Sequence, residues 1–268
     1  MADIPQNKFE INRKESLEYY TFVAPAFEGI VHGFFTRRGG VSSSQFESLN
    51  LGGGLGDSSK NIIENRRRIL HAIGRSEISV FDVWQVHSAQ TLFTDKARNV
   101  GDEYQKADAI FTQNPAVTLL MRFADCVPIL MYHPKKRIVG IIHAGWEGTL
   151  KRISSKAVEE ACRRYFTMPN EWIAGIGPSI GPDHYQIGKK VEEIGKEIFP
   201  RDFESVFIYK DGNVYMNLWE ANRNLLRKAG VEEIISMEVC TACDTGSWFS
   251  HRIENGKTGR FAGLIGLE

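Results

Sequence analysis

Apolar residues recur along this chain at two spacings, one typical of helices and the other typical of strands. From residue 57 to 75 they repeat every three or four positions, with Ser58 or Ser59 able to cap the start and Gly74 ending the pattern. The same spacing returns at residues 149–166, 188–199 and 217–230. We therefore expect four helices, each with one face buried against the rest of the protein.

Apolar runs rich in Val, Ile, Leu and Phe favour buried strands elsewhere in the chain. They span residues 78–88, 116–134, 135–146 and 232–240. These strands come mostly in runs and do not alternate strictly with helices, which favours an α+β fold with a mixed sheet over a doubly wound sheet. No internal repeat, low-complexity tract or Pro/Ser-rich linker divides the sequence, so we expect residues 1–268 to form one domain.

Charge and composition exclude several functional classes. The 33 basic and 33 acidic residues balance, so no global attraction draws the chain to nucleic acid or to an anionic membrane. The N-terminus lacks a signal-peptide core, and the apolar stretches are shorter than the roughly 18 residues that a membrane span needs. Four cysteines are too few for a disulfide scaffold. We expect a cytoplasmic protein that binds neither nucleic acid nor membrane, and we predict no protein partner.

Three polar residues stand where a strand-like run ends or breaks, namely His87, Cys126 and His143. Each one alone is more often a packing residue than a ligand. Together they offer the imidazole and thiolate ligands that zinc prefers, and a set of three leaves the fourth tetrahedral position open, as in catalytic zinc sites. Their spacing matches no local zinc-finger signature, so the prediction of a Zn²⁺ site depends on the residue types.

Asp125 directly precedes the candidate thiolate and has two interpretations. A turn at this point could bring its carboxylate beside the ligands or make it a general acid or base. A carboxylate that merely caps the turn is the alternative. The other histidines have no comparable set of possible ligands near them in the sequence. They are His32, His71, His133, His184 and His251.

The remaining cysteines favour structural roles. Cys240 and Cys243 form a Cys-x-x-Cys motif, which could be a redox pair or half of a zinc site. There is no second such motif and no thioredoxin-like context, so we expect them to be structural or to form a pocket wall. Cys162 adjoins the apolar stripe of a predicted helix and is expected to pack there.

Two glycine-rich segments with arginine could hold an anion. They supply Arg37, Arg38, Asn50 and the glycines between residues 52 and 56. Glycines let backbone amides approach an anion, and arginine grips it with two parallel hydrogen bonds. A flexible loop is the alternative, because no phosphate-loop pattern is present. We expect the Arg66-Arg67-Arg68 run to be a solvated helix face.

Ten short fragments occur together in one order, and the set resembles one bacterial family. They are "TRRGGVS", "SLNLGGGLGD", "ENRRRIL", "QVHS", "ADCVPIL", "HAGWEGT", "GIGPSIGP", "CTAC", "FSHR" and "GRFAGLIGL". In this respect the chain is similar to the laccase-domain (YfiH-like) proteins from about Gly29 to its C-terminus. The resemblance implies a single α+β domain with mixed β-sheets flanked by helices.

The resemblance also implies an activity. It makes His87, Cys126 and His143 the ligands of one zinc ion in a purine nucleoside phosphorylase. The implied substrates are adenosine, inosine, guanosine and methylthioadenosine, each cleaved with phosphate, and adenosine deamination is a second activity. Arg37 is our candidate for binding phosphate, and Asn50 for lining the same pocket. Some family members are linked instead to hydrolytic editing of peptidoglycan precursors.

The family's older label, polyphenol oxidase or laccase, does not fit this sequence as a multicopper enzyme. Multicopper centres use many histidines, usually in His-x-His pairs, whereas this chain has seven histidines and no such pair. Copper in place of zinc at one site stays open. The chain also departs from the family pattern at Glu147, where Arg or Lys is usual and where a basic residue could hold phosphate. Further departures are Asp183, Gln186 and His251.

Two other functions stay open. Cys126 could be the nucleophile of a cysteine-type amidase, with a nearby histidine as its base. Alternatively, zinc could hold the strands together in a binding module that catalyses no reaction.

Overall fold

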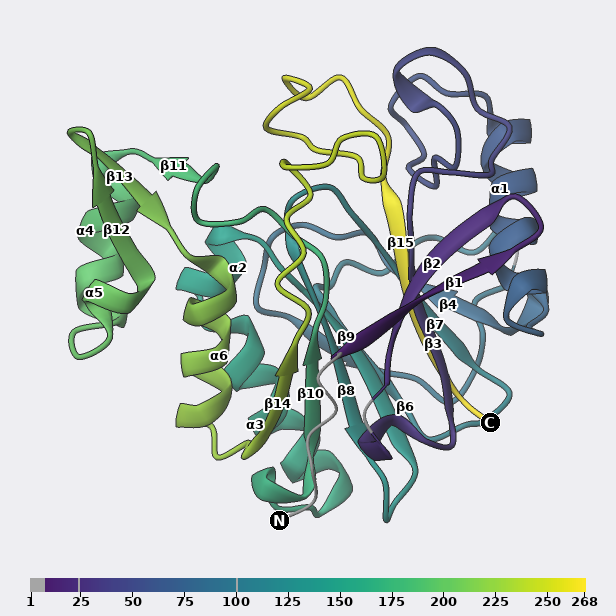
Figure 1. Cartoon of the computed structure of the whole chain (residues 1–268). Helices are drawn as coiled ribbons and strands as arrows, with labels where there is room; N and C mark the ends of the chain where they lie inside the picture. The colour runs from purple at the N-terminus through teal and green to yellow at the C-terminus, as the bar shows by residue number, and fades with distance from the viewer. Residues whose placement is uncertain (1–7, 24, 100) are drawn as a thin grey trace.

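Two six-stranded mixed sheets form the centre of the molecule (Figure 1). The computed structural model describes residues 8–23, 25–99 and 101–268. The first sheet runs in the order β1 (Phe9–Lys14), β2 (Leu17–Phe22), β3 (Ile30–Phe35), β15 (Phe261–Leu267), β7 (Thr118–Phe123) and β4 (Val80–Asp82). Its neighbours are antiparallel except for β4 and β7, so the C-terminal strand lies in the middle of a sheet that begins at the N-terminus.

The second sheet carries the most apolar strands. It runs in the order β14 (Glu233–Ser236), β10 (Ile173–Ile176), β8 (Val127–His133), β9 (Ile138–Ala144), β6 (Ala109–Thr112) and β5 (Thr91–Phe93). The edge pairs are parallel and the inner pairs are antiparallel. Every residue of β8 and β9 is buried, which explains their near-continuous apolar sequence.

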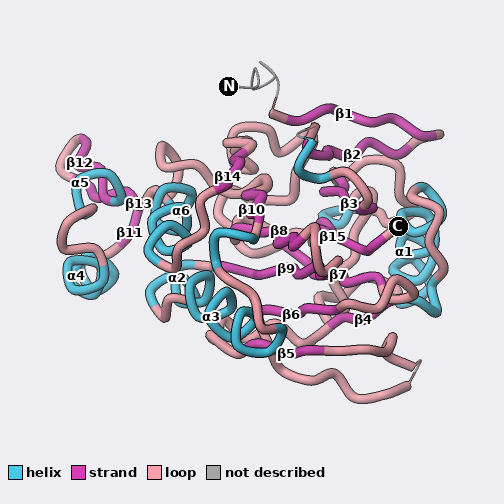
Figure 2. Tube along the Cα trace, turned by 90° about the horizontal axis from the view of Figure 1, so that it is seen from below, coloured by secondary structure: helices cyan, strands magenta, loops and turns pink. Residues whose placement is uncertain are grey.

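Helices cover the outer face of each sheet (Figure 2). Helix α1 (Ser59–Ala72) lies on the first sheet, while α2 (Trp146–Leu150), α3 (Ile153–Tyr165) and α6 (Leu218–Lys228) lie on the second. Apolar side chains fill the three interfaces between these four layers. The predicted α+β fold, with mixed sheets flanked by helices, is therefore confirmed.

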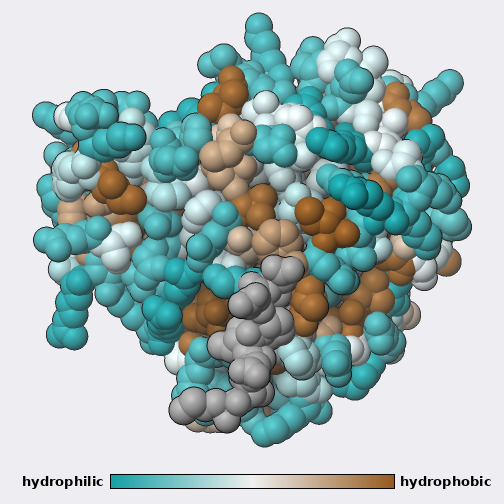
Figure 3. Space-filling model, viewed as in Figure 1, coloured by the Kyte–Doolittle hydropathy of each residue, from teal (hydrophilic) through white to brown (hydrophobic). Residues whose placement is uncertain are grey.

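A small lobe projects beyond α6 and α2 in Figures 1 and 2. It contains α4 (Lys189–Ile198), α5 (Phe203–Val206) and a three-stranded sheet of β11 (Gln186–Ile187), β13 (Asn213–Met216) and β12 (Phe207–Lys210). On the face drawn in Figure 3, hydrophilic residues cover much of this lobe, and apolar residues gather in small groups near the middle of the molecule. Short 3₁₀ turns are η1 (Pro25–Phe27), η2 (Ser44–Phe46), η3 (Glu77–Ser79) and η4 (Pro169–Glu171).

Three of the four predicted helices are confirmed, and the fourth is divided. Helix α1 starts where the Ser58 hydroxyl accepts a hydrogen bond from the Lys60 amide, and Gly74 follows its end with a φ of 71°. The single helix predicted over residues 149–166 is wrong, because Arg152 adopts a left-handed φ of 62° and separates α2 from α3. The strand predicted over 78–88 is shorter than expected, because β4 covers only Val80–Asp82.

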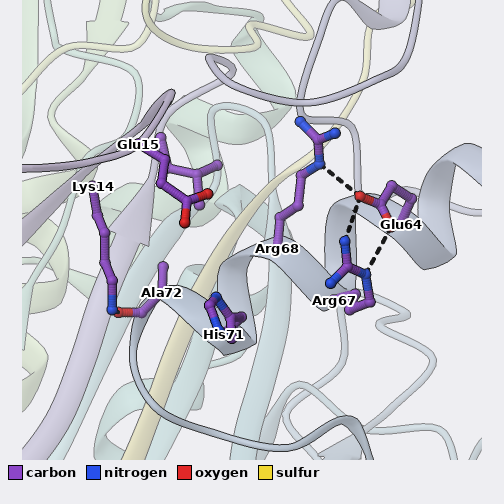
Figure 4. Close-up of a pocket in the computed structure, with 8 residues that line it drawn as sticks. Lys14, Glu15, Glu64, Arg67, Arg68, His71 and Ala72 are labelled. Atoms are coloured by element: carbon purple, nitrogen blue, oxygen red, sulfur yellow. Dashed lines mark hydrogen bonds and ion pairs between the residues drawn. The ribbon is translucent and has the colours of Figure 1, made fainter.

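The arginine run of α1 is not simply a solvated face. Arg66 donates to the buried Asp82 carboxylate at 3.1 Å, so that part of the prediction is wrong. Arg67 and Arg68 both pair with Glu64 at 2.8 Å beside a hollow of about 190 Å³ (Figure 4). Among the described residues, no helix is both long and apolar enough to cross a membrane.

Candidate metal centre and cavity

Three neighbouring strands of the second sheet bring polar residues to one edge. His143 is the last residue but one of β9, and the sheet pairs it with Pro128 of β8. Cys126 directly precedes β8, so it lies beside the end of β9. On the other side, Asp108 directly precedes β6, and its carbonyl accepts a hydrogen bond of 2.7 Å from the His143 amide. The order β8-β9-β6 thus groups a thiol, an imidazole and a carboxylate.

His87 completes this group from the loop after β4. Its Nε2 lies 3.8 Å from the Cys126 Sγ, and one ligand atom from each of His87, Cys126 and His143 lies within 4.8 Å of the other two. A Cβ on Gly145 would lie 2.8 Å from the Cys126 Sγ and 3.0 Å from the His87 Cδ2. Glycine at this turn therefore leaves the thiol and imidazole room to face each other. The structure brings together the three residues that we grouped by residue type.

Asp108 organises both histidines and was missing from the sequence analysis. Its Oδ1 lies 2.9 Å from the His143 Nδ1 and accepts a 3.1 Å hydrogen bond from the His87 amide. Its Oδ2 accepts hydrogen bonds from the Ser88 amide at 2.6 Å and the Ser88 hydroxyl at 2.7 Å. A carboxylate on Nδ1 fixes the imidazole tautomer and leaves Nε2 for a metal. An Asp directly before the apolar run of β6 was the only sequence signal for this role.

The electrostatics favour a thiolate beside a charged imidazole. Burial alone would raise the pKa of the Cys126 thiol, but His143 and His87 outweigh burial and lower it to about 6. Burial alone would lower the pKa of His143, yet Cys126 and Asp108 raise it to about 9. Burial works to raise the pKa of Asp108, while the hydrogen bonds from His143 and Ser88 hold it below its usual value. A thiolate is the form of cysteine that binds metals and attacks substrates.

A cavity of about 820 Å³ opens over these residues. Three guanidinium groups line it, from Arg122, Arg252 and Arg260, and four aromatic side chains line it as well, from Trp84, Tyr104, Trp146 and Tyr185. The glycines at 52–54 form part of its wall. The size suits a small molecule, and the lining combines flat apolar surfaces with cationic groups.

Comparison with known proteins places this chain in a family. A family model described as "Multi-copper polyphenol oxidoreductase laccase" matches residues 31–268. The chain belongs to this laccase family. The purine nucleoside phosphorylase YlmD of Geobacillus stearothermophilus is 34% identical, over 96% of this chain and 97% of that protein. Adenosine deaminase RL5, from an unknown prokaryotic organism, is 32% identical over 90% of this chain and 95% of its own length.

Solved structures agree with this assignment. The crystal structure of YlmD from Geobacillus stearothermophilus superposes with a TM-score of 0.92 at 32% identity, covering 98% of this chain and 99% of that one. A Bacillus licheniformis protein, YfiH, superposes with a TM-score of 0.90 at 32% identity, covering 98% of this chain and all of that one. The laccase-family fold therefore extends over almost the whole chain.

Asp125 lines the cavity, but both of its carboxylate oxygens already accept hydrogen bonds. It adopts a φ of 78°, and its Oδ1 accepts a 2.7 Å hydrogen bond from the Thr241 hydroxyl. Its Oδ2 accepts a 2.7 Å hydrogen bond from the Arg252 amide. Each carboxylate oxygen can accept a further bond, so the proton-transfer role stays a prediction.

Arg37 and Asn50 lie outside the set of residues that line the cavity. The Arg37 guanidinium pairs with Glu254 at 3.1 Å and donates to the Thr245 carbonyl at 2.8 Å. The Asn50 side chain is buried and accepts hydrogen bonds of 2.9 Å from the amides of Gly52 and Arg260. Asn50 thus supports the cavity wall from behind, and the phosphate role expected of Arg37 stays a prediction for a residue outside that wall.

Glu147 lines the cavity at the start of α2. Its carboxylate pairs with Lys151, one helical turn later, at 3.0 Å. The same Lys151 ammonium donates a 2.7 Å hydrogen bond to the His87 carbonyl. A cation therefore links this helix to the backbone of the His87 loop.

A second group of metal-type side chains lies elsewhere in the structure. It consists of Asp183, His184, Cys240 and Cys243. The expectation that His184 has no group of possible ligands around it is therefore wrong. Residues 183–184 and the Cys-x-x-Cys motif are far apart in the sequence and meet only in the folded chain. Cys162 is half-buried on α3 and packs against the helical side of the core, as expected.

Proposed function

We propose that this protein is a zinc-dependent purine nucleoside phosphorylase that also deaminates adenosine. The observation that carries the proposal is a set of two imidazoles and one thiol at the wall of a cavity lined by arginine and aromatic side chains. The names of the relatives YlmD and RL5 support the two activities. Inosine, guanosine and methylthioadenosine are the other proposed substrates.

His87, Cys126 and His143 fit a zinc ion. The donor set of two nitrogens and one sulfur suits zinc better than a hard cation, and it leaves one tetrahedral position open. Asp108 orients the His143 ring as carboxylates commonly do behind a zinc-bound histidine. When bound, zinc supplies a Lewis acid and lowers the pKa of a water ligand toward 7.

The cavity arginines are candidates for holding phosphate. The Arg260 Nη1 donates to the carbonyls of Thr258 and Gly259 at 3.1 and 2.8 Å, and the Arg122 Nη2 donates to the Val83 carbonyl at 2.6 Å. These bonds hold each guanidinium in place while its other N–H groups stay available. A preorganised guanidinium binds a phosphate through two parallel hydrogen bonds.

Phosphorolysis assigns separate tasks to these groups. A phosphate oxygen forms a bond to C1′ of the ribose as the bond from C1′ to the purine nitrogen breaks. The arginines hold the anion beside C1′, and the aromatic side chains offer flat surfaces to the purine. The departing purine takes up one proton, and Asp125 is the proposed group that supplies or relays it.

The direct test is an assay of inosine conversion with and without phosphate. We expect hypoxanthine and ribose 1-phosphate only when phosphate is present. Arg260→Gln should raise the KM for phosphate at least tenfold, because it removes a cation from the cavity. Arg13→Gln, at an arginine that is 74% exposed, is the matched control. Release of base without phosphate would refute phosphorolysis and leave hydrolysis as the reaction.

One observation favours a second candidate, a cysteine amidase acting on peptidoglycan precursors. Cys126, His143 and Asp108 stand in the order of nucleophile, base and orienting carboxylate. Metal-free enzyme distinguishes the two functions, because an amidase would keep its activity without zinc and lose it on alkylation of Cys126. A phosphorylase that needs zinc would lose its activity on metal removal and regain it when zinc returns.

The proposed partners are purine nucleosides and inorganic phosphate, and the proposed location is the cytoplasm. The balanced charge of the chain supports the absence of nucleic-acid and membrane partners.

A further inference from the structure

We propose that Asp183, His184, Cys240 and Cys243 form a second zinc site, which fastens two loops of the cavity wall together. These residues lie apart from His87, Cys126 and His143, and one ligand atom from each lies within 4.8 Å of the other three. The proposal goes beyond the proposed activity, because four protein ligands close the coordination shell and leave no position for substrate.

Four of the six distances between ligand atoms in this cluster are close to those of a tetrahedral site. The His184 Nδ1 lies 3.8 Å from the Cys240 Sγ and 3.6 Å from the Cys243 Sγ. The Asp183 Oδ2 lies 3.7 Å from the Cys243 Sγ and 3.1 Å from the His184 Nδ1. Zinc bonds of about 2.0–2.3 Å require tetrahedral ligand atoms to be about 3.3–3.8 Å apart. The cluster therefore already has nearly the spacing that the ion requires.

The donor types select zinc. Two thiols with the spacing Cys-x-x-Cys, one imidazole and one carboxylate are all zinc ligands, and two thiolates disfavour hard cations such as Mg²⁺ and Ca²⁺. All three measured contacts of His184 use its Nδ1, so a single ring nitrogen faces the cluster. Both cysteines are free thiols in the structure, and they would release their protons to solvent on binding the ion.

The backbone supports Cys240 in a way that suits a metal thiolate. The Gly181 amide donates a hydrogen bond of 3.1 Å to the Cys240 Sγ. A Cβ on Gly181 would lie only 3.1 Å from that sulfur and 2.7 Å from the Asp183 Oδ1, so glycine gives the ligands room to approach the turn. Hydrogen bonds to ligating sulfur tune and orient metal sites.

Topology explains why these residues meet. The chain after β10 and the chain after β14 run side by side, since Ser179 and Cys240 form a parallel bridge (Figure 1). The Thr241 amide then donates to the Ser179 carbonyl at 3.0 Å. Each segment turns immediately afterwards, which places residues 183–184 beside the Cys-x-x-Cys motif.

The same two segments carry residues of the cavity. Ile180 and Tyr185 lie on either side of Asp183 and His184 in the sequence, and both line the cavity. Thr241, between the cysteines, holds the Asp125 carboxylate. An ion in the cluster would therefore fix the position of this wall without touching substrate.

The test is the zinc content of variants that remove each site separately. After dialysis against a chelating resin, we expect about two zinc ions per wild-type chain, and about one in either Cys126→Ser or Cys243→Ser. The double variant should hold none. Cys162→Ser, which changes the cysteine of α3, is the control and should keep both ions.

A second measurement guards against misfolding of a variant. Cobalt bound to Cys126→Ser should give the thiolate charge-transfer and tetrahedral absorption bands, and these bands should vanish in the double variant while the far-ultraviolet circular dichroism stays unchanged. The proposal is overturned if Cys243→Ser has the same metal content as wild type. It is also overturned if Cys126→Ser binds no ion, or if residues 240 and 243 form a disulfide in the purified protein.

Discussion

At the scale of single residues, Asp108 determines how the candidate metal centre is built. Its two oxygens together bond the His143 ring, the His87 amide and both donors of Ser88. A carboxylate that is fully buried would be unfavourable without such partners, and here the bonds to His87 and His143 also position two proposed ligands. Asp108 therefore acts through the histidines and does not contact the proposed substrate.

Asp108→Asn should weaken zinc binding about 10- to 100-fold. The substitution replaces one of the two acceptor oxygens by an NH₂ group, which cannot accept the hydrogen bonds that Asp108 receives. Chelator competition measures the affinity, and kcat/KM for inosine should fall with it at limiting zinc. The matched control is Asp211→Asn, at an exposed turn residue whose φ of 51° asparagine tolerates. Equal zinc affinity in the two variants would contradict this role for Asp108.

His32 should make the fold sensitive to acid. Burial lowers its pKa from 6.5 to about 4, and its Nε2 accepts a 2.9 Å hydrogen bond from the Phe22 amide. The unfolded chain takes up a proton near pH 6.5 and the folded chain does not, so this contribution to stability is present above pH 6.5 and is lost toward pH 4.

Urea unfolding at pH 7 and pH 5 measures this effect. Wild type should lose about 2 kcal/mol more stability than His32→Gln over that interval, because glutamine keeps an acceptor near Phe22 and does not titrate. Equal losses in the two proteins would show that His32 is not the titrating group.

Residue type and position together predicted His87, Cys126 and His143, because imidazole and thiolate are ligands that zinc prefers and each residue stands where a strand-like run ends or breaks. They could not predict Asp108 or His184. A carboxylate before a strand has many ordinary roles, and the neighbours of His184 come from a segment about 60 positions away, as the 3.8 Å contact with Cys240 illustrates.

At the scale of elements, the turn from β9 into α2 decides how closely the ligands can approach. Gly145 is the N-cap of α2, and the space that its Cβ would fill is taken by Cys126 and His87. Its φ of −72° is open to other residues, so contact and not backbone strain explains the glycine.

Gly145→Ala should therefore disturb the metal centre. We expect at least a tenfold loss of zinc affinity and of phosphorolysis, because the methyl group displaces the thiol or the imidazole. Gly188→Ala is a matched control, since Gly188 is the N-cap of α4 and its Cβ would meet nothing within 4 Å. Both variants lose a favourable cap, at a cost of up to about 1 kcal/mol, and only the first should lose zinc. Similar zinc affinities in both would count against the contact.

Apolar periodicity predicted α1, α4 and α6 well, because their buried faces and end signals are local. It could not predict the break at Arg152, because Leu150 and Ile153 continue the apolar stripe on both sides and no glycine marks the left-handed residue. Strand β1 was not predicted, since it is largely exposed and has no apolar run.

At the scale of the whole molecule, both sheets contribute to the cavity. The proposed ligands come from the second sheet and the β4 loop, while Arg122 lies on β7 of the first sheet and Arg260 directly precedes β15. The sequence predicted the fold class and family, but not that the C-terminal strand inserts between β3 and β7. Strand pairing over such distances depends on tertiary packing, which local patterns do not encode.

The most direct test of the proposed function is a four-way assay of inosine cleavage by the wild-type protein, metal-free or reconstituted with zinc, and with or without phosphate. We expect hypoxanthine at a substantial rate only when zinc and phosphate are both present, because the ligand set and the cavity arginines are both needed. Full activity of the metal-free protein, or hypoxanthine release without phosphate, would contradict a zinc-dependent phosphorylase.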